Sequence, residues 1–320
     1  MTASRYVCVM GPTAVGKTAL AVWLHRAGGT ELISVDSAMV YRGLDIGSGK
    51  PDAVTLAEAP HRLIDIRDPS DVYSAADFAV DARREITAIT AAGRLPLLVG
   101  GTGLYFRALR EGFSILPPAN AEVRAALEEE ARGHGWEALH ARLASVDPDA
   151  ARRIHPSDRQ RIQRALEVYE LTGASMTALQ EQPRSGGGQS EDVLVLILVP
   201  SERKALHETI AKRFDQMLSL GLVDEVARLR ARGDLHRDLP AMRAVGYRQV
   251  WDYLDGNVGY AEMCEKAVAA TRQLARRQLT WLRSISDAVV LEIDLSGLEG
   301  ANALGGVART AARHIDHWCG

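Results

Sequence analysis

The sequence has few cysteines and no long apolar run, and each absence excludes a class of protein. Its three cysteines, Cys8, Cys264 and Cys319, lie far apart and are odd in number, so neither a disulfide framework nor a zinc site is expected. The most apolar stretch, 193–199, has the length of a buried strand, whereas a membrane helix needs about 20 apolar residues. The first motif begins at residue 11, which leaves no room for a signal peptide. We therefore expect a cytoplasmic protein without a membrane anchor.

The sequence also lacks a basic excess, because 38 lysines and arginines stand against 41 aspartates and glutamates. A net charge of −3 argues by itself against a polyanionic partner. Arginine is nevertheless concentrated in two stretches, 152–164 and 272–283, of which the first contains one acid, Asp158, and the second none. Such clusters are typical of an RNA-binding surface or of a solvated helix face, and clustering alone does not decide between them.

The chain does contain a complete phosphate-binding motif near its start. Residues 11–18 read Gly-Pro-Thr-Ala-Val-Gly-Lys-Thr, which fits the pattern G-x-x-x-x-G-K-[ST] at every fixed position. An apolar run precedes the motif and an apolar-periodic run follows it, so we expect a strand, a loop and a helix whose N-terminus binds phosphate. In that geometry Lys17 would contact the outer phosphate and the Thr18 hydroxyl would bind Mg²⁺. The predicted diphosphate site comprises Gly11, Thr13, Ala14, Val15, Gly16, Lys17 and Thr18.

Two further segments are expected beside the phosphate loop. Strand 31–35 ends in Asp36, and strand 95–99 runs into a glycine-rich segment that contains Thr102. Because the carboxyl ends of parallel strands converge where ligands bind, Asp36 is the main carboxylate expected there. It could act as a metal partner, as a base or as a cap of the following turn. At Thr102 the chain has a hydroxyl near the place where a phosphate-loop ATPase usually has a carboxylate.

The pattern along the chain predicts a core with an insertion. Residues 1–118 and 191–320 alternate strands and helices, which predicts an α/β fold with a parallel sheet of the phosphate-loop type, flanked by helices. Residues 119–190 predict an inserted, all-helical domain. The glycine-rich stretch 184–190 predicts a mobile hinge or surface loop.

Some local elements can also be predicted. We expect a short strand at 62–66, a helix opening at Ser74, a turn at 133–135 and a long helix near 260–286. Periodicity along that long helix favours Trp281 as a core residue over a base-stacking platform.

Seven blocks of the sequence are informative together: GPTAVGKT (11–18), DSAMVY (36–41), DIGSGKP (45–51), GGTGLY (100–105), HPSDRQRIQRALE (155–167), MRAVGYRQ (242–249) and ATRQLARRQLTWLR (270–283). With these blocks the sequence resembles the tRNA dimethylallyltransferases. The blocks lie in the family's order and span nearly the whole chain. The resemblance implies transfer of a dimethylallyl group from its diphosphate, with Mg²⁺, to the exocyclic amine of the adenosine just 3′ of the anticodon in tRNA. It also implies that pyrophosphate leaves without nucleotide hydrolysis.

For that reaction Asp36 is the candidate base, and Thr102 would hold the amine or share the proton path. The phosphate loop, Mg²⁺ and either Arg164 or Arg248 would neutralise the pyrophosphate. The inserted domain would bind the anticodon stem-loop. The resemblance assigns tRNA contacts to Asp36, Ser37, Ala38, Met39, Thr102, Arg124, Gln160, Arg161, Ile162, Gln163, Arg164, Arg243, Ala244, Val245, Gly246, Tyr247, Arg248, Arg276, Arg277, Gln278, Leu279, Thr280, Trp281, Leu282 and Arg283.

The sequence departs from the family's pattern at a few positions. Met39 stands where many members have glutamine, and Ser157 stands where asparagine is usual. The chain ends at Gly320 without the zinc-finger extension of eukaryotic members, so the resemblance implies a bacterial-type, monomeric enzyme. The alternatives are a phosphate-loop kinase for a small metabolite, which would turn over ATP, and an RNA-binding module switched by a nucleotide.

Overall fold

The computed structural model describes residues 4–182, 184–185, 191–296 and 302–320, and the chain forms two compact units. The larger unit comprises Met1–Leu109 and Gln189–Gly320, and the smaller one comprises Arg110–Gly188. Apart from residues 184 and 185, the predicted hinge at 184–190 lies outside the described residues.

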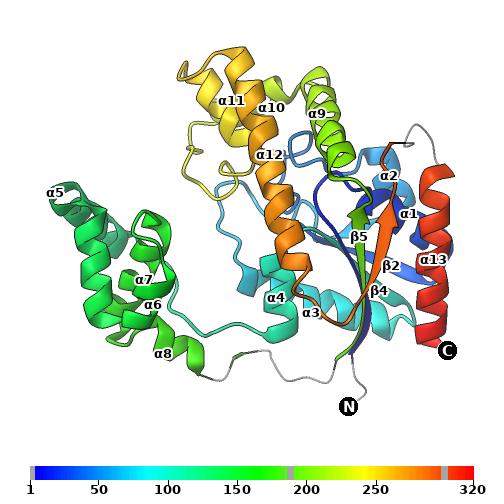
Figure 1. The fold of residues 1–320 in the computed structure, drawn as a ribbon, viewed down its shortest axis with the longest axis horizontal. Coiled ribbons are helices and arrows are strands. Elements are labelled where there is room, and N and C mark those ends of the chain that lie inside the picture. The colour runs from blue at the N-terminus through cyan, green and yellow to red at the C-terminus, as the bar shows by residue number, and fades with distance from the viewer. Residues whose placement is uncertain (1–3, 183, 186–190, 297–301) are drawn as a thin grey trace. The chain divides into compact units, whose positions relative to one another are not determined.

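The larger unit is built on a six-stranded parallel sheet, which confirms the predicted fold class (Figure 1). The strand order is β3-β2-β4-β1-β5-β6. A short strand lies where one was predicted at 62–66, but it ends at Arg62, because Leu63 and Asp65 have φ angles of 63° and 57°, which an extended strand does not adopt. The strands are β1 (Ser4–Met10), β2 (Thr30–Val35), β3 (His61–Arg62), β4 (Leu95–Gly100), β5 (Glu191–Pro200) and β6 (Ala288–Ile293).

Helices cover both faces of this sheet, as the alternation of side chains along β1 requires. Tyr6, Cys8 and Met10 belong to one apolar cluster and Val7 and Val9 to the other. The first cluster includes residues of α3 (Ala75–Ala91), α4 (Gly103–Glu111), α10 (Leu222–Ala231), α11 (Tyr247–Leu254) and α12 (Tyr260–Leu282). The second includes residues of α1 (Lys17–Arg26), α9 (Arg203–Ser219) and α13 (Asn302–Cys319).

Capping residues set several helix ends. The predicted start at Ser74 is confirmed, because its hydroxyl accepts from the Asp77 N–H while the Asp77 carboxylate accepts from the Ser74 N–H. The sequence analysis missed α2 (Ala53–Glu58), whose signal is the capping Asp52. Among the described helices, none is long and apolar enough to span a membrane.

The smaller unit is helical. It contains α5 (Ala121–Val146), α6 (Pro148–Arg153), α7 (Arg159–Thr172) and α8 (Met176–Glu181). The turn expected at 133–135 corresponds to a kink in α5 at Gly135, whose φ of 81° and ψ of 158° are not helical. Leu127, Leu143, Ile162 and Leu166 are among the side chains of its own apolar core.

Candidate active site

A cavity of about 1830 Å³ lies at the carboxyl end of the sheet in the larger unit. The strand register creates it, because Gly100 of β4 pairs with Met10 of β1 on one side and with Val35 of β2 on the other. The segments that follow these three strands therefore emerge next to one another, as predicted. They carry Asp36, Thr102 and the phosphate loop, of which Thr13, Ala14, Gly16, Lys17 and Thr18 line the cavity. The predicted site residues Gly11 and Val15 are buried beneath it.

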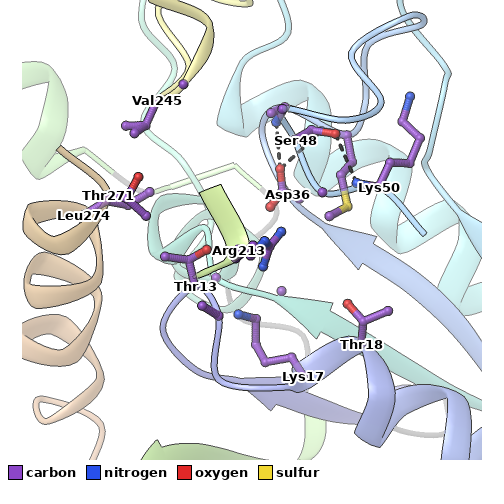
Figure 2. Close-up of a pocket in the computed structure, with 18 of the residues that line it drawn as sticks. Thr13, Lys17, Thr18, Asp36, Ser48, Lys50, Arg213, Val245, Thr271 and Leu274 are labelled. Carbon is purple, nitrogen blue, oxygen red and sulfur yellow. Dashed lines mark hydrogen bonds between the residues drawn. The ribbon is translucent and has the colours of Figure 1, made fainter. Parts of the chain in front are cut away.

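The phosphate loop has the predicted order of strand, loop and helix. Gly16, with a φ of 95°, turns the chain into α1, whose first residues, Lys17 and Thr18, line the cavity (Figure 2). The Lys17 ammonium donates a hydrogen bond to the carbonyl of Pro12 at 2.7 Å. Burial and the neighbouring Arg213 guanidinium lower the pKa of Lys17 to about 8, against the opposing effect of Asp36. The α1 N-terminus adds its own positive potential.

Arg213 is a functional candidate that the sequence analysis missed. It lies on α9 and extends into the cavity, where Figure 2 shows its guanidinium between Lys17 and Asp36. Burial lowers the pKa of Arg213, and the Asp36 charge opposes that shift. Two neighbouring cations in one cavity are stabilised by an anionic ligand. The adjacent Phe214 packs in the core, and helical periodicity marks that core-facing side of α9 but not a cation on the cavity side.

Asp36 and Thr102 lie together at the edge of the cavity. One carboxylate oxygen of Asp36, Oδ1, accepts hydrogen bonds from the backbone N–H groups of Ala38 at 2.8 Å and Met39 at 3.2 Å. Asp36 therefore caps the following turn and also faces the cavity. The Thr102 hydroxyl accepts from the Ser37 N–H at 3.2 Å. These bonds fix the orientation of both side chains.

A buried carboxylate, Glu225, holds the loop that forms another wall of the cavity. It accepts hydrogen bonds from the N–H groups of Asp45, Ile46 and Gly47, at 2.8–3.2 Å. The Tyr247 hydroxyl donates to Glu225 at 2.6 Å and accepts from the Ser48 N–H at 3.1 Å. Burial and Glu225 raise the pKa of Tyr247 far above its usual value. Nothing in the sequence signals Glu225, because the loop whose N–H groups it binds lies 178–180 residues away along the chain.

The segment 243–248 divides between the cavity and the interior. Arg243, Ala244, Val245 and Gly246 line the cavity, whereas Arg248 is exposed and outside its described lining. The Tyr247 side chain is fully buried. Its predicted contact with tRNA therefore does not fit as a side-chain contact, because its ring fills the core and its hydroxyl is bonded to Glu225.

Helix α12 supplies a further wall. Leu274, Arg277, Gln278 and Trp281 line the cavity, and Thr271 and Leu274 project toward it in Figure 2. Trp281 is half-buried and stacks on Phe106, with ring centroids 6.3 Å apart. It thus packs against the core, as predicted, and also reaches the cavity. Leu282 is buried, so its side chain is not available for the predicted tRNA contact. The other predicted tRNA contacts of this segment are Arg276, Leu279, Thr280 and the C-cap residue Arg283. All of these except Leu279 are exposed.

In the helical unit the predicted tRNA contacts fall into two groups. Gln160 and Arg161 are exposed on the first turn of α7. Arg124 and Arg164, in contrast, both donate hydrogen bonds to the buried carboxylate of Glu167. Burial raises the pKa of Glu167, but these hydrogen bonds outweigh burial and hold it below its usual value. Arg164 therefore has a structural role in this unit.

In the stretch 160–164 of the helical unit, the side chain of Ile162 is buried and packs in the apolar core of that unit. The side chain of Ile162 is therefore not available for the predicted tRNA contact. Gln163 is half-buried and donates to the carbonyl of Arg124 at 3.2 Å. Cys8 is buried, Cys264 is half-buried and Cys319 is exposed, and the described residues contain no disulfide.

A parallel sheet with a phosphate loop after its first strand, and two cations beside a carboxylate in one cavity, define a phosphate-loop α/β protein. A family model described as IPP transferase matches residues 39–285. The tRNA dimethylallyltransferase of Alkalilimnicola ehrlichii is 61% identical over 275 residues, which is 86% of this chain and 86% of the relative. The chain therefore belongs to the IPP transferase family.

Three further proteins are similar to this chain in sequence or in structure. The tRNA dimethylallyltransferase of Thiobacillus denitrificans is 58% identical over 298 residues, or 93% of this chain and 94% of the relative. The tRNA isopentenylpyrophosphate transferase of Bacillus halodurans has a similar structure, with a TM-score of 0.69, 38% identity and coverage of 99% of this chain and 98% of its own. A eukaryotic dimethylallyltransferase acting on tRNA, 24% identical, has the same fold with a TM-score of 0.77, over 98% of this chain and 80% of its own.

Proposed function

We propose that this chain transfers a dimethylallyl group from dimethylallyl diphosphate to the exocyclic amine of the adenosine 3′ of the anticodon in tRNA. The observation that carries the proposal is the composition of one cavity in a member of this family. Lys17 and Arg213 bring positive charge to it, and Asp36 and Thr102 bring a base and a hydroxyl. A transfer that releases pyrophosphate needs both kinds of group.

The phosphate loop and Arg213 would bind the diphosphate. Its negative charge would lie at the N-terminus of α1, next to the Lys17 ammonium and the Arg213 guanidinium. As the bond between the allylic carbon and the diphosphate oxygen breaks, charge increases on the leaving pyrophosphate. The two cations stabilise that charge, and this lowers the barrier.

The residues present also fit Mg²⁺. Thr18 offers a hydroxyl oxygen in the cavity, and Mg²⁺ prefers a few protein oxygens combined with substrate phosphates. Among the described residues, no group of three or more His, Cys, Asp or Glu could hold a metal by itself. A bound Mg²⁺ would supply further neutralisation of the diphosphate oxygens.

Asp36 would act at the other end of the reaction. The adenine amine is a weak nucleophile, because its lone pair is delocalised into the ring, and it must lose a proton as the nitrogen–carbon bond forms. Oδ1 of Asp36 accepts the hydrogen bonds of the turn, and within the described residues no hydrogen bond reaches Oδ2. Oδ2 would take the proton. The Thr102 hydroxyl, which accepts from Ser37, keeps its own proton to donate along the same path.

The arginine clusters would bind the RNA. Exposed Arg161 on α7 and exposed Arg276 on α12 suit contacts with phosphates. We propose that residues 119–190 form the part that binds the anticodon stem-loop. The reaction also requires the adenine to leave the stack of the loop, which costs a few kcal/mol that arginine and aromatic contacts offset. We expect a monomer to be sufficient.

The proposal is tested with radiolabelled dimethylallyl diphosphate, Mg²⁺ and an anticodon stem-loop. We expect label in the RNA and an equal amount of released pyrophosphate. A matched stem-loop with guanosine at the target position, which has a carbonyl in place of the amine, should remain unlabelled. Failure to label either RNA, together with turnover of ATP, would instead support the kinase alternative.

A further inference from the structure

The amide of Gln278 joins two loops of the active site. Its oxygen Oε1 accepts a hydrogen bond from the backbone N–H of Thr13 at 2.9 Å. Its nitrogen Nε2 donates to the carbonyl of Gly101, also at 2.9 Å. Thr13 lies in the phosphate loop and Gly101 directly precedes Thr102. One side chain from α12 therefore links the diphosphate site to the segment that carries the catalytic hydroxyl.

This link is directional. A backbone N–H can only donate and a carbonyl can only accept, so the two ends of the amide cannot be exchanged. The approach is also close, because a Cβ atom at Gly101 would lie 2.5 Å from Nε2 of Gln278 and 3.2 Å from the Gly11 carbonyl. Glycine at 101 is thus what allows the link to form. These constraints fix the separation of the two loops to within the tolerance of a hydrogen bond.

The surroundings of Gln278 differ from those of its neighbours on the helix. Arg276 and Arg277 are exposed, whereas Gln278 is half-buried and uses both ends of its amide on the protein itself. Those two bonds leave the amide poorly placed to recognise RNA. Gln278 instead lies where it can set the distance between the two loops that carry the reacting groups, and these groups must be held in a near-attack arrangement.

We propose that Gln278 is a positioning residue, which holds the phosphate loop and the Gly101–Thr102 segment at the separation that transfer requires. The inference deepens the proposed function and rests on it. It predicts that Gln278 acts on the rate of the bound complex more than on affinity for tRNA, although the resemblance to the family suggests a tRNA contact at this position.

The test compares Gln278→Met, Gln278→Asn and a control, Gln273→Met, which changes an exposed glutamine on the same helix. Methionine keeps the length and loses both hydrogen bonds, and asparagine keeps the amide but is too short to reach both loops. At saturating substrates, single-turnover transfer should fall about 10- to 100-fold in Gln278→Met and less in Gln278→Asn. Stem-loop affinity should stay within about twofold of wild type, since neither variant removes an RNA contact.

A second measurement does not depend on transfer. Affinity for inorganic pyrophosphate, measured by calorimetry with Mg²⁺ and no RNA, should fall several-fold in Gln278→Met and remain unchanged in the control. Wild-type rate and wild-type pyrophosphate affinity in Gln278→Met would overturn the inference, as would a selective loss of stem-loop affinity. If the wild type and the control transfer nothing, the proposed function fails, and pyrophosphate affinity still tests whether Gln278 positions the loop.

Discussion

At the scale of single residues, the surroundings of Lys17 in the cavity change the pKa of its ammonium group. Burial and the nearby Arg213 lower its pKa to about 8. The cation is therefore present below about pH 8 and is lost as the pH rises through that value. A bound diphosphate favours the cation, so binding should raise the pKa and take up a proton near pH 8.

We predict that affinity for dimethylallyl diphosphate falls above pH 8, by at most about tenfold per pH unit, because one proton is linked to binding. Titration calorimetry from pH 6.5 to 9.5 measures this dependence. Lys17→Met should bind more weakly at every pH and should lack the additional loss above pH 8. The ligand's own titration is common to both proteins and cancels in the ratio of their affinities. An unchanged ratio across the range would contradict the assignment.

The second residue-scale prediction concerns Asp36. Asp36→Asn keeps an oxygen that can accept from the N–H groups of Ala38 and Met39, so the turn should persist. It cannot take a proton, and the chemical step should slow by about 10²-fold or more. Single-turnover transfer at saturating substrates gives this rate. Affinities for both substrates should stay within a few fold of wild type.

The same single-turnover rate is measured for Thr102→Val. It should slow the same step more weakly, because it removes a single hydrogen bond of about 1 kcal/mol. If both residues serve one proton path, the double variant loses less than the sum of the single effects. A near-normal rate for Asp36→Asn would leave Asp36 as only a turn cap or metal partner.

At the scale of elements, the Glu225 network determines the position of a whole loop. A carboxylate on α10 binds three successive N–H groups of residues 45–47, and Tyr247 at the start of α11 completes the network. Buried donors and acceptors of this kind are costly to leave without partners. The loop is therefore held by two helices that lie about 180–200 residues further along the chain.

We predict that Tyr247→Phe lowers the free energy of unfolding by about 1–3 kcal/mol, because Glu225 and the Ser48 N–H each lose a partner inside the protein. Urea unfolding measures the loss. Tyr253→Phe, at a half-buried tyrosine on the same helix, should change stability less. Normal stability with weakened stem-loop binding in Tyr247→Phe would show instead that the hydroxyl contacts tRNA.

The sequence allowed the main elements and most of the cavity to be predicted. Apolar runs ending in Gly11, Asp36 and Gly101 marked the strands whose tips converge, because a parallel sheet brings those tips together. Arg213 and Glu225 could not be found in this way. Their roles depend on contacts between segments far apart in sequence, and helical periodicity does not encode such contacts. The strand expected at 62–66 stops at Arg62, because two non-glycine residues that follow it have positive φ angles.

At the scale of the whole molecule, a chain with a net charge of −3 can bind a polyanion only through local clusters. Arg161 belongs to the helical unit and Arg276 to the larger one, and both side chains are exposed. If each neutralises one phosphate, both units contribute to the same salt-dependent affinity. Neither unit would then account for the whole salt dependence.

We predict that Arg161→Ala and Arg276→Ala each reduce the slope of log affinity against log salt concentration by about 0.7–0.9. Fluorescence anisotropy with a labelled stem-loop between 50 and 300 mM salt, roughly the range in which counterion release dominates, gives the slopes. Arg309→Ala, at an exposed arginine on α13, serves as the control and should leave the slope unchanged. Equal slopes in all variants would identify the clusters as solvated helix faces.

The strand order described above also has a consequence for synthesis of the chain on the ribosome. The central strand β1 pairs with β4 on one side and with β5 on the other. Between the end of β4 at Gly100 and the start of β5 at Glu191 the ribosome must make the whole helical unit. At about 5–20 residues per second, that interval is on the order of ten seconds. During that interval β1 is an open edge of the nascent sheet, because its partner β5 has not yet been made. The contiguous helical unit can already close its own core.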